Sequence, residues 1–121
     1  MVNVMPELDE KDELLVRNLI NAGLQKNVAK ALVYLRKVEE STSVEIERAA
    51  RLRQPEVSIA MQVLEKKGWV LKKNIKKEGK GRPVYKYRLS KPFTEVIKEI
   101  ENELNKKIDE IKTIINALKS P

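Results

Sequence analysis

Residues 41–89 read STSVEIERAARLRQPEVSIAMQVLEKKGWVLKKNIKKEGKGRPVYKYRL, and this stretch decides the fold. Thr42 can cap a helix because its hydroxyl accepts a hydrogen bond from a free amide, and Glu45 can reach back to the cap amide. This first helix is predicted to end near Ala50. A turn over residues 51–54 follows, and Pro55 opens a second helix because its fixed φ suits the first helical position.

The second helix has one apolar face and one open face. Val57, Ala60, Met61 and Leu64 recur at intervals of three and four residues, which predicts a buried stripe. Gly68 ends the helix, since glycine accepts a left-handed backbone at no steric cost. The residues left on the open face are Gln54, Glu56, Ser58, Ile59 and Gln62.

Two runs of β-type residues follow the second helix. Residues 69–75 and 84–89 are rich in aromatic and β-branched side chains, and residues 76–82 between them hold two glycines and four basic residues. Residues 66–88 carry ten Lys or Arg and one acid, Glu78. Such a basic hairpin beside two helices predicts a winged helix-turn-helix, a mainly α fold with a small β-hairpin (α+β).

The open face of the second helix has the chemistry of base recognition. In helix-turn-helix docking the first turns of the second helix enter the major groove. Gln54 and Gln62 can pair with adenine, and Ser58 can donate or accept. Glu56 either accepts from cytosine or only stabilises the start of the helix. The predicted contacts from this region are Arg53, Gln54, Pro55, Glu56, Ser58, Ile59 and Gln62.

The hairpin is predicted to contact phosphates, because its charge exceeds what solubility needs. Arg82, on a narrow turn between Gly81 and Pro83, could enter a minor groove over A·T-rich steps, or it could instead pair with Glu78. Trp69, Tyr85 and Tyr87 are expected to pack within the hairpin and core. The predicted wing contacts are Lys72, Lys73, Lys76, Lys77, Lys80, Arg82 and Lys86.

The runs RQPEVSIAMQVLEKKGWV and GKGRPVYKYRLS, with GLQKNVAKALVYLRKVEESTSVEIERAARL upstream, resemble archaeal winged-helix transcriptional regulators of the ArsR and TrmB (MarR-like) group. The resemblance covers roughly residues 23–90 and implies DNA binding in transcription. The sequence departs from the metal-sensing branch of the group, because it contains no Cys and no His. A thiolate or imidazole metal site is therefore excluded, and no cofactor is expected.

The segments before this stretch predict two more helices. Asp9 can cap a helix that carries Asp12 and Glu13 in its first turn and ends at Gly23. A second helix is expected over residues 25–38, with Val28, Leu32, Leu35 and Val38 forming an apolar stripe. A short strand is expected near Ser41 or Thr42. Tyr34 is expected in the core or in a dimer contact.

Residues 91–121 predict a long coiled-coil helix that joins two copies of the chain. Apolar residues recur there at steps of four and three, with one extra step of four, and about 28 helical residues extend roughly 40 Å. A domain this small cannot cover such a helix. The alternative is packing onto the chain's own domain. The predicted dimer interface is Phe93, Ile97, Ile100, Leu104, Ile108, Ile111, Ile115 and Leu118.

Charge and composition narrow the function. The formal net charge is +7, and residues 1–90 carry nineteen basic and twelve acidic side chains whereas residues 91–121 carry six of each. The partner is therefore expected to be double-stranded DNA, bound by a winged-helix domain over residues 1–90, with a dimerisation helix over residues 91–121. No apolar run reaches the length of a membrane span, and the N-terminus lacks the pattern of a signal peptide, so a cytoplasmic, nucleoid-associated protein is expected.

The sequence predicts a binding protein and not an enzyme. It has no His, no Cys and no glycine-rich phosphate loop between a strand and a helix. The predicted function is a homodimeric DNA-binding transcriptional regulator. Two alternatives stay open: an architectural, chromatin-type protein with low sequence specificity, and a winged-helix module that docks on the transcription machinery.

Overall fold

The computed structural model describes residues 7–75 and 84–120. The chain divides into two compact units, Met1–Lys91 and Pro92–Pro121. Within the described residues the elements are α1 (Glu10–Asn21), α2 (Lys26–Leu35), β1 (Ser41–Thr42), α3 (Ser43–Ala50), α4 (Gln54–Lys66), β2 (Val70–Ile75), β3 (Val84–Leu89) and α5 (Phe93–Lys119). The predicted α+β fold, five helices with a small sheet, is confirmed.

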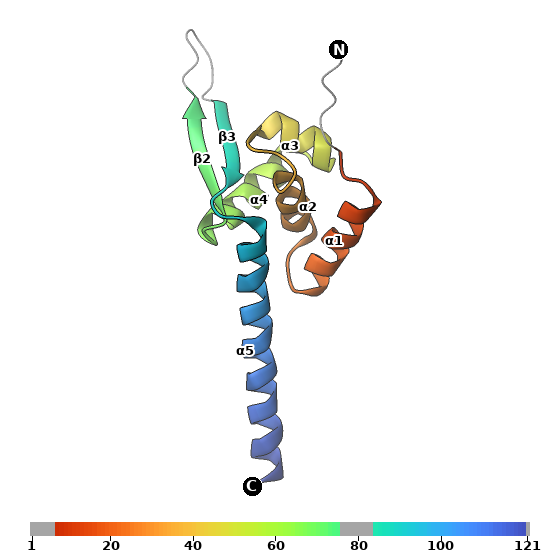
Figure 1. The fold of residues 1–121 in the computed structure, drawn as a ribbon, viewed down its shortest axis with the longest axis vertical. Helices are drawn as coiled ribbons and strands as arrows, with labels where there is room; N and C mark the ends of the chain where they lie inside the picture. The colour runs from red at the N-terminus through yellow and green to blue at the C-terminus, as the bar shows by residue number, and fades with distance from the viewer. Residues whose placement is uncertain (1–6, 76–83, 121) are drawn as a thin grey trace. The chain divides into compact units, whose positions relative to one another are not determined.

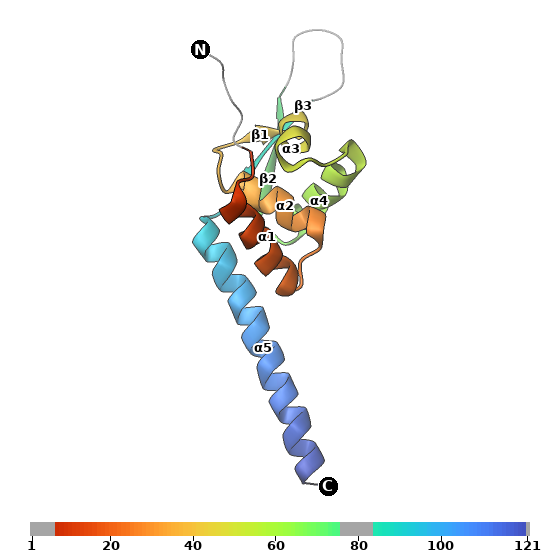
Figure 2. The ribbon, with the colours of Figure 1, turned by 90° about the vertical axis from the view of Figure 1, so that its right-hand side faces the viewer.

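Helix α2 forms the centre of the first unit. Seven of its ten residues are buried, from Val28 to Leu35, so the expected single stripe was too narrow. The reason is visible in Figures 1 and 2: α1 lies on one side of α2, and α3, α4 and the hairpin lie on the other. A helix enclosed by neighbours on several sides buries most of its circumference, and here alanines and valines fill the positions that a surface helix would give to polar residues.

The sheet has three antiparallel strands in the order β1-β3-β2. Ser41 pairs with Tyr87, and Val70 pairs with Leu89 at the base of the hairpin. The phenol of Tyr34 on α2 lies 2.9 Å from the Ser41 hydroxyl, and both residues are about 1% exposed. Tyr34 is therefore a core residue, and its hydrogen bond satisfies the one polar group that the buried ring brings with it.

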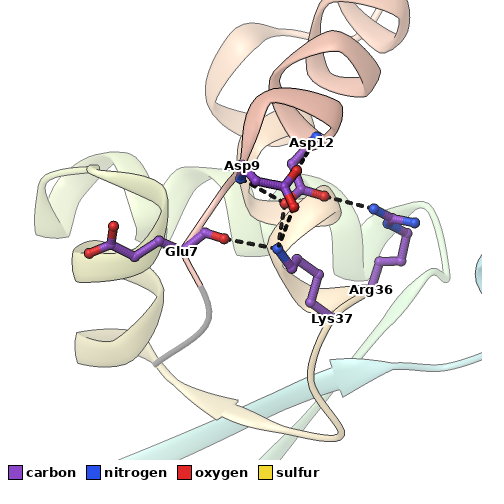
Figure 3. Close-up of polar contacts among 5 residues, drawn as sticks. All are labelled: Glu7, Asp9, Asp12, Arg36 and Lys37. Carbon is purple, nitrogen blue, oxygen red and sulfur yellow. Dashed lines mark hydrogen bonds and ion pairs between the residues drawn. The ribbon is translucent and has the colours of Figure 1, made fainter. Parts of the chain in front are cut away.

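Helix α1 is fixed at its start by a buried carboxylate (Figure 3). The side chains and backbone amides of Asp9 and Asp12 form a reciprocal capping box with two 2.9 Å bonds. Arg36 donates to Asp12 at 2.7 Å, and Lys37 donates to the same carboxylate. Burial alone would raise the pKa of Asp12, but the donors Lys37, Asp9 and Arg36 lower it from 3.8 to about 2. The end of α2 is thus tied to the start of α1.

Several predicted element boundaries shift by one to three residues. The helix expected over residues 25–38 spans Lys26–Leu35, and the strand expected from Trp69 begins at Val70. The recognition helix begins at Gln54 and not at Pro55, so proline occupies its second position. That position also leaves its missing amide without cost, because the first amides of a helix have no partner within the helix.

Helix α5 runs for 27 residues from Phe93, as predicted. Every described residue from Glu101 to Ser120 is exposed. Among the described residues, no helix is long and apolar enough to cross a membrane. The same part of the chain contains no group of three or more acidic side chains that could hold a metal ion.

Candidate nucleic-acid interface

The start of α3 has the cap that the sequence predicts. The Thr42 hydroxyl accepts from the Glu45 amide at 3.2 Å, and the Glu45 carboxylate accepts from the Thr42 amide at 2.9 Å. Arg51 closes α3 with a left-handed backbone at φ 54°. Nothing in the sequence indicates this conformation, because glycine or asparagine is the usual residue there. Only the direction that the chain must take from α3 to α4 requires it.

Helix α4 buries the predicted stripe. Val57, Ala60 and Met61 are 1% exposed and Leu64 is fully buried. Gly68 follows the helix with φ +79°, as expected of a residue that ends a helix. The stripe fixes the rotation of α4 about its axis, and this rotation turns Gln54, Ser58, Ile59 and Gln62 toward solvent.

Glu56 acts on the helix start. Its carboxylate accepts from the Arg53 amide at 2.8 Å and from the Asn27 side chain at 3.1 Å. The pKa of Glu56 is lowered, first by the Arg53 amide and then by Asn27 and the positive charges of Arg53 and Lys30, against a smaller opposing effect of burial. Of the two predicted roles, this geometry supports helix-start stabilisation, since both carboxylate oxygens already have donors.

The remaining polar side chains of the open face have no protein partner among the described residues. Gln54, Ser58 and Gln62 are exposed, and none makes a side-chain hydrogen bond within residues 7–75 and 84–120. Ile59 is 58% exposed on the same face. Exposed amide and hydroxyl groups beside an isoleucine make a surface that can donate, accept and contact a methyl group, which matches what base edges offer.

The wing places like charges opposite each other. Lys73 pairs with Lys86 across β2 and β3, and Leu71 pairs with Arg88. Side chains alternate between the faces of a strand, so Lys73, Lys86 and Arg88 share one face. Like charges in directly opposed positions destabilise a hairpin. Lys86 also forms a surface ion pair with Glu40 at 3.2 Å. This face therefore concentrates positive charge.

All charged side chains in the described part of the wing and in the residues next to it are basic. Residues 66–75 and 84–90 contain six Lys or Arg and no acid. Lys72 and Lys73 are exposed. The predicted contacts Lys76, Lys77, Lys80 and Arg82 lie outside the described residues, as does Glu78, the alternative partner of Arg82.

The aromatic residues of the hairpin pack as predicted. Trp69 is 5% exposed and Tyr87 is 8% exposed. Lys67 lies 5.0 Å from the Trp69 ring, and Lys72 lies 4.6 Å from the Tyr85 ring. These rings are thus occupied by core packing and by cations, and base stacking is left without an exposed ring among the described residues of the hairpin.

A pocket of about 370 Å³, partly open to solvent, lies on the first unit, and no pattern in the sequence indicates it. Val16, Ile20, Ala49 and Ala50 provide its apolar wall. Its charged residues are Glu7, Glu13, Arg17, Lys26, Lys30 and Arg51. It is formed by residues more than 30 positions apart in the chain, so only the packing of α1 and α2 against the end of α3 creates it.

Solved structures share this fold. TrmBL2, an archaeal chromatin protein with a novel mode of DNA binding, has a TM-score of 0.63 and 22% identity over 90% of this chain, which spans 39% of that protein. A possible transcriptional regulator from Methanosarcina mazei has a TM-score of 0.70 and 14% identity, over 84% of this chain and 87% of that one. MarR from E. coli has a TM-score of 0.51 and 22% identity, over 91% and 87%.

No family model matches the chain, and no curated protein sequence matches it either. At 14–22% identity the three structures share a fold with this chain. That fold is the winged helix-turn-helix with a long C-terminal helix, as the sequence predicts.

Proposed function

We propose that the chain is a homodimeric DNA-binding protein that regulates transcription. One observation carries this proposal: the exposed face of α4 lies in the same unit as a hairpin whose two described strands carry four basic and no acidic side chains. A surface that can contact base edges and a surface rich in positive charge together fit double-stranded DNA. Neither surface has a role in packing the core.

In this proposal α4 enters the major groove. Gln54, Ser58 and Gln62 contact base edges, and Ile59 contacts a thymine methyl group. Arg53, at the N-cap, is exposed and contacts a phosphate. Pro55 and Glu56 hold the start of α4 near the DNA backbone. The positive end of the helix dipole there favours the phosphates.

The wing crosses to the adjacent minor groove and its phosphates. Lys72, Lys73 and Lys86 are its described contacts, and Lys76, Lys77, Lys80 and Arg82 complete the set proposed from the sequence. Each phosphate neutralised releases counterions, so the affinity should fall steeply with salt. The opposed Lys73 and Lys86 support this role, because a phosphate offsets the repulsion between them.

The residues of α5 join two copies. Leu104, Ile108, Ile111 and Leu118 are 36–76% exposed, which is unusual for a run of aliphatic side chains in a monomer. Burying each one stabilises the pair by about 1.5–3 kcal/mol, against an association cost of the order of 4–15 kcal/mol. Two copies would present two recognition helices to a pseudo-palindromic site.

The second candidate is an architectural protein that coats DNA with little sequence preference. One of the solved structures with this fold is described as a chromatin protein, which supports keeping it. Both candidates bind duplex DNA, and they differ in the ratio of specific to random affinity.

A salt titration separates them. Sites selected by the protein from a random duplex pool are compared with random duplexes between about 50 and 200 mM salt. A regulator gives a specificity ratio of about 10³ or more, whereas a coating protein gives a ratio near one with a similar salt slope. Failure to bind any duplex at low salt would overturn both.

A further inference from the structure

Helix α5 has a row of apolar side chains, here called the seam, whose C-terminal half is exposed among the described residues. Leu104, Ile108, Ile111 and Ile115 are 36%, 47%, 56% and 44% exposed, while Phe93 and Ile97 are half-buried and Ile100 is buried. We propose that a second α5 covers the seam in antiparallel orientation, with Leu104 of the two copies facing each other at the two-fold axis. This inference rests on the homodimer of the proposed function and specifies its geometry.

The spacing of the seam sets the register. From Phe93 to Ile115 the apolar steps are 4, 3, 4, 4, 3 and 4, which read the same in both directions from Leu104. The two adjacent steps of four form a stutter that breaks the heptad repeat. In an antiparallel pair, each apolar residue of one helix faces an apolar residue of the other only if the two stutters lie at the same level. This happens when the two Leu104 residues face each other. Ile97 then faces Ile111 of the second copy, and Ile108 lies at the level of the buried Ile100.

Charge decides between the two orientations. A parallel pair also aligns each stutter with itself, but it places Lys107 beside Lys112 of the second copy, because a residue at heptad position g meets the following e. The antiparallel pair places Lys107 beside Glu103 of the second copy instead. Two attractive contacts therefore replace two repulsive ones.

The charges of the whole helix agree. Residues 93–104 carry four acidic and one basic side chain, whereas residues 105–119 carry four basic and two acidic ones. Antiparallel packing lays the acidic half of one helix along the basic half of the other. It also opposes the two helix dipoles, and both effects favour this orientation.

The geometry gives the dimer a defined span. With the centre at Leu104 and a rise of 1.5 Å per residue, the two α5 helices begin about 33 Å apart along their common axis. Two helix-turn-helix half-sites one turn apart are separated by roughly 34–36 Å. The two chains therefore enter the paired helices at opposite ends, and the distance between these two points is close to one turn of the duplex.

Spin-label distances test the register in the full chain. The sequence has no cysteine, so Asn102→Cys or Asn116→Cys gives one label per copy. Antiparallel packing at Leu104 predicts labels about 6 Å apart along the axis at residue 102 and about 36 Å apart at residue 116. A parallel pair predicts no separation along the axis at either residue, so the two label distances should be similar. A short separation at residue 116 would overturn the inference.

Sedimentation of the same variants separates this failure from that of the proposed function. A monomeric mass would remove both the dimer and its geometry. A dimeric mass with a short distance at residue 116 would leave the homodimer intact and remove only the antiparallel register.

Charge reversal gives an independent test with opposite signs. Lys107→Glu should weaken the dimer roughly tenfold, since it sets Glu103 and the new acid side by side twice. The double variant Glu103→Lys with Lys107→Glu should restore the affinity. Lys106→Glu, the same charge change on the outer face, is the matched control and should change it less than about twofold. A parallel pair predicts a tighter dimer for Lys107→Glu, which would contradict the inference.

Discussion

The side-chain amide of Asn27, at the start of α2, donates a 3.1 Å hydrogen bond to the carboxylate of Glu56 in the first turn of α4. The two residues are 29 positions apart in the chain. Through this contact the central helix of the core holds the first turn of α4 in place. Glu56 also closes the cap at Arg53, so a single side chain fixes both the start and the position of α4.

The first prediction concerns this contact. Glu56→Gln should lower the melting temperature modestly, because the amide loses the charge and one acceptor for Asn27. The base preferences of the protein should stay the same, because the carboxylate is used within the protein. Selection of bound sites with the variant and the wild type measures this. A change of preference at a cytosine position would instead assign Glu56 to base reading.

The second prediction concerns Gln62, which is exposed and unpartnered on α4. Gln62→Ala should cost about 1–3 kcal/mol for binding to a selected site, and it should relax the base preference at one position, where glutamine pairs with adenine. Random duplexes should bind as before. Asn18→Ala removes an exposed amide from α1 and serves as the control. Equal losses on selected and random duplexes would place Gln62 outside base readout.

The third prediction concerns the wing. Lys73→Gln should weaken binding to all duplexes and reduce the slope of log affinity against log salt by about 0.9 for each lost phosphate contact, or about 1.8 for the two copies of a dimer. The folded protein should gain slightly in stability, because Lys73 faces Lys86. Lys11→Gln, on α1, makes the same change of charge and should leave the slope unchanged. A slope unaffected by Lys73→Gln would remove this residue from the DNA contact.

The fourth prediction concerns acid stability. Because the pKa of Asp12 is about 2 in the folded chain and 3.8 ordinarily, the unfolded state binds more protons between these values. The ionised Asp12, with Arg36 and Lys37, therefore contributes about 2 kcal/mol to the free energy of unfolding above pH ~4. This contribution is lost as the pH falls toward ~2.

Asp12→Asn should lower the free energy of unfolding at pH 7 by about 2–4 kcal/mol, because Arg36 and Lys37 lose a buried partner. It should also flatten the pH dependence below pH ~4. Denaturant unfolding at several pH values measures both effects. Asp109→Asn, on the exposed part of α5, should change neither. A variant that keeps the same acid slope would show that another carboxylate controls it.

The order of helices and strands follows from local chemistry in the sequence. Thr42 and Glu45 predict the start of α3 because a cap needs residues only three positions apart. The spacing of Val57, Ala60, Met61 and Leu64 predicts the buried face of α4 because helical periodicity acts over three to eight residues. The outward set of Gln54, Ser58, Ile59 and Gln62 follows from the same periodicity. These features could be predicted because every interaction that they need is close in the chain.

Tertiary structure alone decided the contacts between distant segments. From the sequence alone, Asp12 is predicted only to place a negative charge at the start of α1. In the folded chain it is buried and forms ion pairs with Arg36 and Lys37. Arg51 takes a left-handed backbone that no local signal announces. The sequence allows Glu56 either to contact a base or to stabilise the start of α4, and the hydrogen bond from Asn27 favours the second role. In each case the deciding partner or constraint comes from how the helices pack, and this depends on the fold as a whole and not on neighbouring residues.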